Sequence, residues 1–102
     1  MIIGEFKNAT ITITTDNDLT AEVDLGRPYE TMLVHIPALT SCNLICYVAE
    51  KTGGTFYPLG TMAAGEGTLA DTWEIGGHQF VKIGTSVAQA ANRIFRICGV
   101  RS

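Results

Sequence analysis

Three runs in the first part of the chain alternate apolar and polar residues, which is the pattern of strands with one buried face. These runs are residues 8–14, 20–25 and 29–36. Their inward-facing residues are expected to be Ile11 and Ile13, then Ala21, Val23 and Leu25, then Met32, Val34 and Ile36. Polar and glycine-proline turns at 16–18 and 26–28 separate the runs. Pro37 is expected to end the third strand because it has no amide hydrogen to donate.

A β-hairpin is predicted in the middle of the chain. Residues 43–50 and 55–59 read as its two arms, and the glycine-containing loop 51–54 joins them. In the first arm Leu44, Cys46 and Val48 share one face, and Ile45 and Tyr47 share the other.

The last part of the chain carries three more strand patterns, at 71–75, 79–85 and 92–100. Gly76 and Gly77 are expected to close the first of them. The last is apolar on both sides and should lie centrally in its sheet. Residues 60–70 are small and polar, so we expect a loop there with a short strand near its end. Residues 86–91 have the composition of a helical turn that is too short for an independent helix.

Eight short strands in 102 residues predict an all-β fold: a single-domain antiparallel β-sandwich, jelly-roll-like. The length fits one domain covering 1–102, with residues 1–7 as an N-terminal arm. An immunoglobulin-like sandwich is the alternative, since Trp73 lies between Cys46 and Cys98. That pairing would leave Cys42 odd, so the jelly roll is favoured.

The charge balance narrows the classes of function. Charged residues make up 17% of the chain and the formal net charge is −3, whereas a nucleic-acid binder or a polybasic membrane surface would carry a basic field. No apolar run is long enough to span a bilayer, and the N-terminus lacks the pattern of a signal peptide. We therefore expect no direct nucleic-acid or membrane partner.

Candidate catalytic and metal-binding residues are sparse. An odd cysteine count favours reduced thiols, and Cys42 and Cys46 would lie too far apart on an extended strand to form a disulfide or share a zinc ion. His35 and His78 could act as bases only beside an activated serine, and the sequence contains no motif that marks one. The sequence therefore predicts no catalytic residue, no metal and no cofactor, and a chain that is not an enzyme.

Two other binding functions stay open at this point. Asp16, Asp18, Glu22 and Asp24 cluster around one turn and are either a weak calcium site or a solvated turn, although the spacing fails the EF-hand pattern. The aromatic residues are either core residues or a sugar-stacking face. Trp73 and Tyr57 are the residues to test for carbohydrate binding.

Several segments in order resemble a family of small virion proteins. They are 10–13, 19–26, 36–40, 43–50, 54–60, 80–84 and 89–93, each a pattern of strand and turn rather than a catalytic signature. Together they are similar to small jelly-roll structural proteins of tailed bacteriophages, of the capsid decoration or cement type. The resemblance implies a protein that binds the major capsid protein, stabilises the head and lies on the capsid surface of the virion after assembly in the host cytoplasm. Others of this loose group belong to tails or head fibres, so a carbohydrate- or receptor-binding module is the alternative.

Self-association is also expected. A mean hydropathy of +0.21 in so small a domain implies more apolar surface than one core can bury, which predicts a homo-oligomer, a trimer or dimer. The loop 60–72 and the arm 1–7 are candidate contacts; the arm either adds to the sheet of a neighbour or starts the first strand of its own chain. The candidate interface residues are Ile2, Ile3, Phe6, His35, Trp73 and His78.

Overall fold

The computed structural model describes residues 2–40, 42–65 and 69–101, and this part of the chain is all β. Its strands are β1 (Ile2–Ile3), β2 (Lys7–Ile11), β3 (Val23–Ile36), β4 (Cys42–Ala49), β5 (Tyr57–Gly65), β6 (Leu69–Thr85) and β7 (Arg93–Arg101). All of their pairings are antiparallel, in the order β1-β7-β3-β6-β4-β5, and β2 also pairs with β7. The predicted all-β antiparallel class is confirmed. No helix in the described ranges could cross a membrane.

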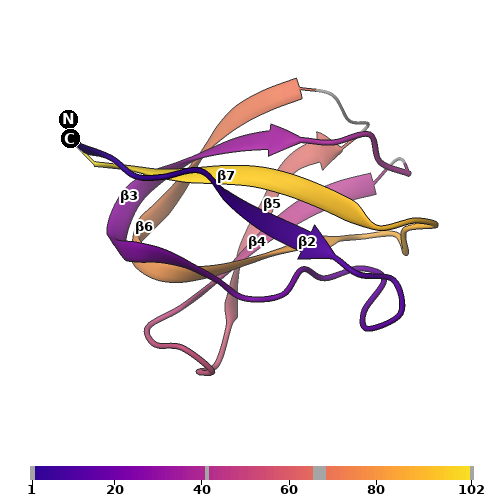
Figure 1. The fold of residues 1–102 in the computed structure, drawn as a ribbon, viewed down its shortest axis with the longest axis horizontal. Coiled ribbons are helices and arrows are strands. Elements are labelled where there is room, and N and C mark those ends of the chain that lie inside the picture. Colours follow the sequence, from indigo (N-terminus) through magenta and orange to yellow (C-terminus); the bar gives the residue numbers. More distant parts are fainter. Residues whose placement is uncertain (1, 41, 66–68, 102) are drawn as a thin grey trace.

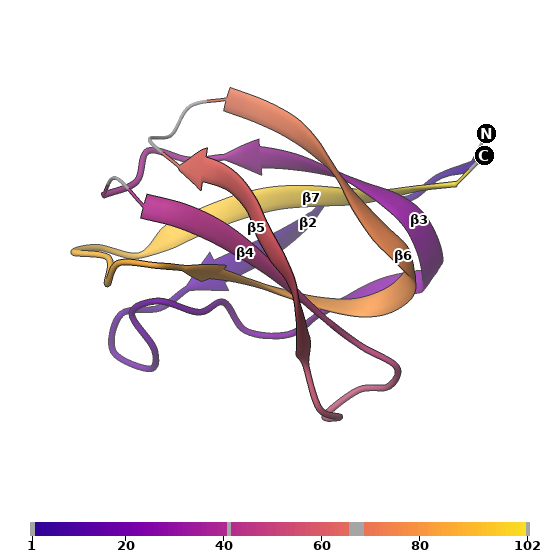
Figure 2. The ribbon, with the colours of Figure 1, turned by 180° about the vertical axis from the view of Figure 1, so that it is seen from behind.

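The two longest strands, β3 and β6, bend instead of ending at their glycines. Gly26, Gly76 and Gly77 adopt positive φ angles of 93°, 64° and 84°, which a residue without a Cβ tolerates. The pairing register of β3 with β6 shifts on either side of Tyr29, which pairs with His78. Figures 1 and 2 show both strands turning sharply at the same end of the molecule. The predictions that 26–28 and 76–77 separate strands are therefore wrong, because glycine permits a bulge as readily as a turn.

These bends fold the single sheet into two layers. One layer joins β2, β7, the second half of β3 and the first half of β6; the other joins the first half of β3, the second half of β6, β4 and β5. Counted along the chain as eight segments, the layers read 1-8-3-6 and 2-7-4-5, the strand order of a jelly-roll-like sandwich. β7 lies between paired neighbours, as its two-sided apolar pattern predicts.

The core lies between the layers. The first layer contributes Ile11, Met32, Val34, Trp73, Phe95 and Ile97, and the second contributes Val23, Leu44, Cys46, Val48, Val81 and Ile83. Alternation along each strand selects these residues, because successive side chains point to opposite faces. The inward face predicted for 29–36 is confirmed, and of the two faces of the first hairpin arm it is the one with Leu44, Cys46 and Val48 that is buried.

Other boundaries differ from the expectation. The first strand ends at Ile11, because the amides of Thr15 and Asp16 bond to Thr12 O in a turn that leaves Ile13 40% exposed. Ala21 is exposed, since β3 begins only at Val23.

The remaining corrections concern the connections. The hairpin is confirmed as β4 with β5, but β5 begins at Tyr57 and continues to Gly65, so most of the loop expected at 60–70 is strand. Positions 66–68 of that loop lie outside the described residues. No helical turn forms at 86–91. The third strand does end before Pro37.

Candidate interaction surface

The outward face of the β2–β7–β3 layer holds four side chains from three separate segments. Asn8 on β2 pairs with Arg96 on β7, and Arg96 pairs with His35 on β3, so the three lie in one row across the sheet. Phe6, just before β2, completes the group. We call Phe6, Asn8, His35 and Arg96 the Phe6 patch.

The Phe6 patch is held together by ring and hydrogen-bond contacts. The centroids of the Phe6 and His35 rings are 5.0 Å apart with a 38° interplanar angle. The Arg96 guanidinium carbon lies 5.6 Å from the Phe6 centroid, within cation–π range. Arg96 Nη1 donates to Asn8 Oδ1 at 2.7 Å. A guanidinium has five N–H donors, so a planar fork remains for an acidic partner.

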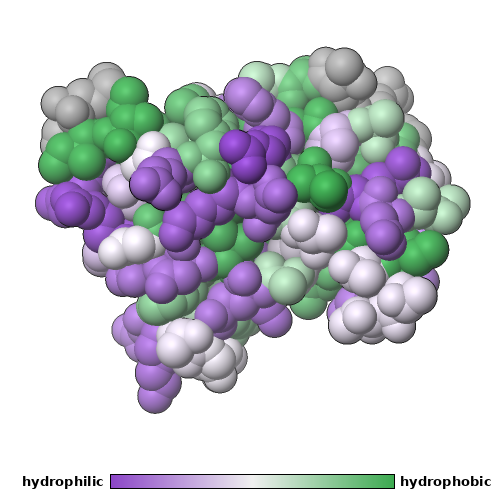
Figure 3. All heavy atoms as spheres, viewed as in Figure 1, coloured by the Kyte–Doolittle hydropathy of each residue, from purple (hydrophilic) through white to green (hydrophobic). Residues whose placement is uncertain are grey.

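Apolar side chains surround this patch without being covered. Ile3 is 61% exposed, Ile94 49%, Ile2 45% and Phe6 39%. Figure 3 shows hydrophobic and hydrophilic residues interspersed on this side, with apolar residues gathered at the end nearest the two chain termini. Exposed apolar residues next to a polar rim are typical of interaction sites.

Four of the six predicted interface residues thus lie on or beside one face. Ile2 and Ile3 form β1, which pairs with Arg101 and Val100 of β7. The arm therefore starts the sheet edge of its own chain, the second of the two alternatives. That these residues contact a partner stays a prediction, and so does a contact by Phe6 or His35.

The other two predicted residues lie elsewhere. Trp73 is 2% exposed, pairs with Met32 and donates from Nε1 to Asp71 Oδ2 at 3.3 Å, so its ring belongs to the core and offers no surface to a partner. The five-residue pattern around it was too short to show which face it takes. His78 lies at the bend, where its Nδ1 is 2.7 Å from Ile75 O.

Sequence reasoning missed Asn8 and Arg96. Their alternation signal was present, since Arg96 lies between the inward Phe95 and Ile97. What the sequence did not contain was the register that places β2, β7 and β3 side by side. The patch is therefore a product of pairing between distant segments.

The acidic residues near the first turn divide into two pairs with different surroundings. Glu22 accepts bonds from Thr52 Oγ1 at 2.6 Å and Gly53 N at 2.8 Å, which lower its pKa. Bonds from Gln79 Nε2 and Gly26 N lower the pKa of Asp24 in the same way. Glu22 thus binds the 51–54 loop, and Asp24 links β3 to β6.

Asp16 and Asp18 are exposed at the tip of the turn. A hydrogen bond with Asp16, followed by burial and the like charge, raises the pKa of Asp18. Across the described ranges no group of three His, Cys, Asp or Glu side chains could hold a metal ion. The described residues therefore contain no group of three such side chains that could bind calcium.

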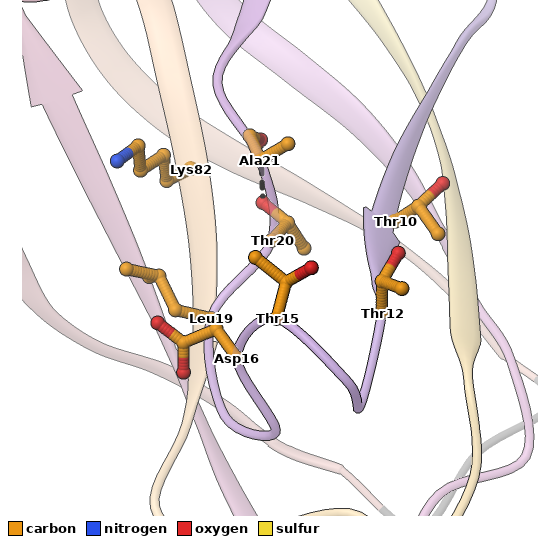
Figure 4. Close-up of a pocket in the computed structure, with 8 residues that line it drawn as sticks. All are labelled: Thr10, Thr12, Thr15, Asp16, Leu19, Thr20, Ala21 and Lys82. Atoms are coloured by element: carbon orange, nitrogen blue, oxygen red, sulfur yellow. Dashed lines mark hydrogen bonds between the residues drawn. The ribbon is translucent and has the colours of Figure 1, made fainter.

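A hollow of about 260 Å³ lies between the end of β2, this turn and β6. Its lining residues, drawn in Figure 4, are Thr10, Thr12, Thr15, Asp16, Leu19, Thr20, Ala21 and Lys82. The Thr20 hydroxyl is already used, donating to Ala21 O at 3.0 Å and accepting from Ile83 N. Lys82 Nζ lies 4.6 Å from the Phe56 ring centroid. The hollow offers hydroxyl groups to a polar ligand.

None of the three cysteines forms a disulfide. Burial raises the pKa of the Cys46 thiol to about 12, and burial also raises the pKa of Cys42 and of Cys98. Their thiols are protonated at neutral pH, which suits packing rather than nucleophilic chemistry.

Comparison with known proteins gives similarity at the level of the fold. No family model matches the sequence, and no curated protein matches it. The SPBc2 prophage-derived protein YomS is similar in structure, with a TM-score of 0.53 and 13% identity over 97% of each chain. A family 89 glycoside hydrolase from Clostridium perfringens gives 0.54 and 14% identity over 96% of this chain, which spans 14% of the hydrolase. The capsid asymmetric unit of cyanophage Pam1 gives 0.36, a score at which a shared fold is not established.

Proposed function

We propose that this chain is a structural protein of a bacteriophage virion, specifically a capsid decoration or cement protein that binds the major capsid protein and stabilises the head. The observation that carries the proposal is the uncovered apolar face beside the Phe6 patch on an otherwise well-packed domain. The segment pattern described above and a fold like that of a prophage-derived protein over the whole chain support it. The chain would lie on the capsid surface, and its assembly would take place in the host cytoplasm.

The mechanism is additional buried interface across subunit boundaries, which raises the barrier to rupture of the shell. Ile3 pairs with Val100 on the outward face, at the end where both termini emerge, and Ile2 is exposed beside it on the other side of β1; both are apolar groups that we assign to the shell contact. Burying one isoleucine contributes about 1.5–3 kcal/mol, so each is expected to change capsid affinity about tenfold or more.

Co-sedimentation with empty capsids from the source phage tests this proposal. The wild-type chain should pellet with the capsids, and Ile3→Asp should bind at least about tenfold more weakly. Leu59→Asp is the matched control, because Leu59 is 40% exposed on β5, at the opposite edge of the sheet. A wild-type chain that stays in the supernatant would refute the decoration role.

The chain is further proposed to act without catalysis. In the described ranges no group of three His, Cys, Asp or Glu side chains could hold a metal ion, and the thiols are protonated. Any turnover that is lost on His35→Ala or His78→Ala would overturn this view.

A carbohydrate- or receptor-binding module of a phage tail or head fibre is the second candidate. The threonine-lined hollow favours it, since hydroxyl groups and a carboxylate are the groups that bind polyols. A glycan array would test it: a specific signal abolished by Thr15→Val, or by Tyr57→Ala on the 63% exposed Tyr57, would support this function. Trp73→Ala is not informative here, because its ring is buried.

A further inference from the structure

The Phe6 patch is a prepared site for a carboxylate. Arg96 is held by Asn8 and by the Phe6 ring, and within the described residues it makes no ion pair. His35 adds a second donor beside it. A guanidinium fixed in this way loses little side-chain entropy when it binds, and its remaining N–H groups match a carboxylate.

The same chain presents carboxylates of the complementary kind. Asp16 and Asp18 are exposed, and no cation contributes to the pKa of Asp18. Their backbone is rigidly placed, because Asn17 O accepts from Gln89 N at 2.8 Å and Asp18 O accepts from Thr85 N at 2.8 Å. In Figure 1 the turn lies beyond the end of β2, at the end of the molecule opposite the two termini.

Both surfaces also carry exposed apolar side chains. Ile13 at 40% and Val87 at 43% exposure accompany the acidic turn, and Ile94 at 49% accompanies the patch. Contact between the two surfaces would therefore bury apolar area around a charged centre, the usual anatomy of a protein interface.

We propose that the Phe6 patch binds the Asp16–Asp18 turn of a second copy of this chain. This inference rests on the proposed assembly role and names the contact between copies. The two surfaces differ, so the contact is heterologous, and repeated contacts close into a ring or extend as a chain of subunits.

Complementary charge variants test the proposal. Sedimentation velocity of the wild-type chain should show oligomers that weaken as salt is raised from about 0.05 M to about 0.5 M. Arg96→Glu alone, and Asp16→Lys with Asp18→Lys, should each weaken self-association at least about tenfold. Arg27→Glu and Glu50→Lys are controls, because both residues are exposed and lie outside the two surfaces.

The decisive measurement is a mixture of the two defective variants. Arg96→Glu keeps a working acidic turn, and the double lysine variant keeps a working patch, so the two variants should associate when mixed although each alone associates weakly. Circular dichroism checks the fold, and Arg96→Gln replaces Arg96→Glu if the charge reversal unfolds the chain. A mixture that stays monomeric, a wild-type chain that is monomeric throughout, or controls as defective as the variants would overturn the proposal.

Capsid co-sedimentation separates this inference from the proposed function. Association of the mixed variants of a chain that ignores capsids would leave the self-contact standing and remove the decoration role. Capsid binding by a chain whose variants do not complement each other would do the reverse.

Discussion

The two faces of the β2–β7–β3 layer are built by the same strands, but apolar residues of the inward face are buried while apolar residues of the outward face are exposed. On the inward face Ile11, Met32, Phe95 and Ile97 are fully buried. On the outward face Ile94 is 49% exposed, although it is the immediate neighbour of Phe95. Alternation alone makes this difference. On β7 the apolar residues of the outward face are either exposed, as Ile94 is, or covered by the chain's own N-terminal arm, as Cys98 is.

The largest expected effect comes from the core. Trp73→Ala should lower the free energy of unfolding by about 3–5 kcal/mol, because it removes a fully packed ring and leaves a cavity. Ile94→Ala on the outward face should change it by no more than about 0.5 kcal/mol. Urea unfolding of both variants measures the contrast, and equal losses would mean that Ile94 is not at the surface of the folded monomer.

A glycine on the inward side gives the next largest effect. A Cβ at position 99 would overlap the Tyr29 ring, which packs flat against Gly99. Gly99→Ala should therefore cost about 1–3 kcal/mol through overpacking. The cost should shrink in a Tyr29→Ala background, which a double-mutant cycle by thermal unfolding would measure. Equal costs in both backgrounds would show that the strain lies elsewhere.

The inward face was predictable and the outward face was not. Alternation within 29–36 is local, so Met32, Val34 and Ile36 could be assigned to the core from the sequence. The Phe6 patch needs Phe6, His35 and Arg96 to meet, and the register that brings them together is set by pairing across most of the chain.

The bends in β3 and β6 could not be predicted from the sequence, for a different reason. Gly26 and the Gly76–Gly77 pair indicate a change of backbone direction, and both a turn and a bulge satisfy that indication. The pairing of Tyr29 with His78 is what keeps β3 and β6 continuous. That pairing joins segments almost fifty residues apart, beyond the reach of any local pattern.

A smaller effect on stability is expected at Glu22, whose carboxylate is held by exposed hydrogen bonds rather than by packing. The folded-state pKa of Glu22 is lowered by Thr52 and Gly53, so its carboxylate stabilises the fold above its unfolded-state pKa, and this is lost as the pH falls through the folded-state value. Wild type should therefore be more stable than Glu22→Gln at pH 7, and the difference should shrink as the pH falls through the folded-state pKa of Glu22. Melting temperatures across a series of pH values from 7 downward measure it. Glu30→Gln is the control, because Glu30 is exposed and its carboxylate makes no hydrogen bond in the described structure.

The smallest effect is expected at the N-terminal arm, whose residues 2–7 cover part of the outward face. Cys98 pairs with Leu33 on the outward side, yet it is fully buried, and its Sγ donates to Gly4 O at 3.1 Å. The arm therefore shields this thiol, and a thiol reagent should modify half-buried Cys42 first and leave Cys46 and Cys98 protected until the chain opens.

Gly4→Ala places a Cβ 2.6 Å from the Tyr29 hydroxyl oxygen, which should loosen the arm and speed the labelling of Cys98 several-fold while Cys46 stays unchanged. Mass spectrometry of the labelled peptides separates the three sites. Rapid labelling of Cys98 in the wild type would show that the arm leaves its own sheet readily. That result would favour the alternative in which the arm adds to the sheet of a neighbouring copy.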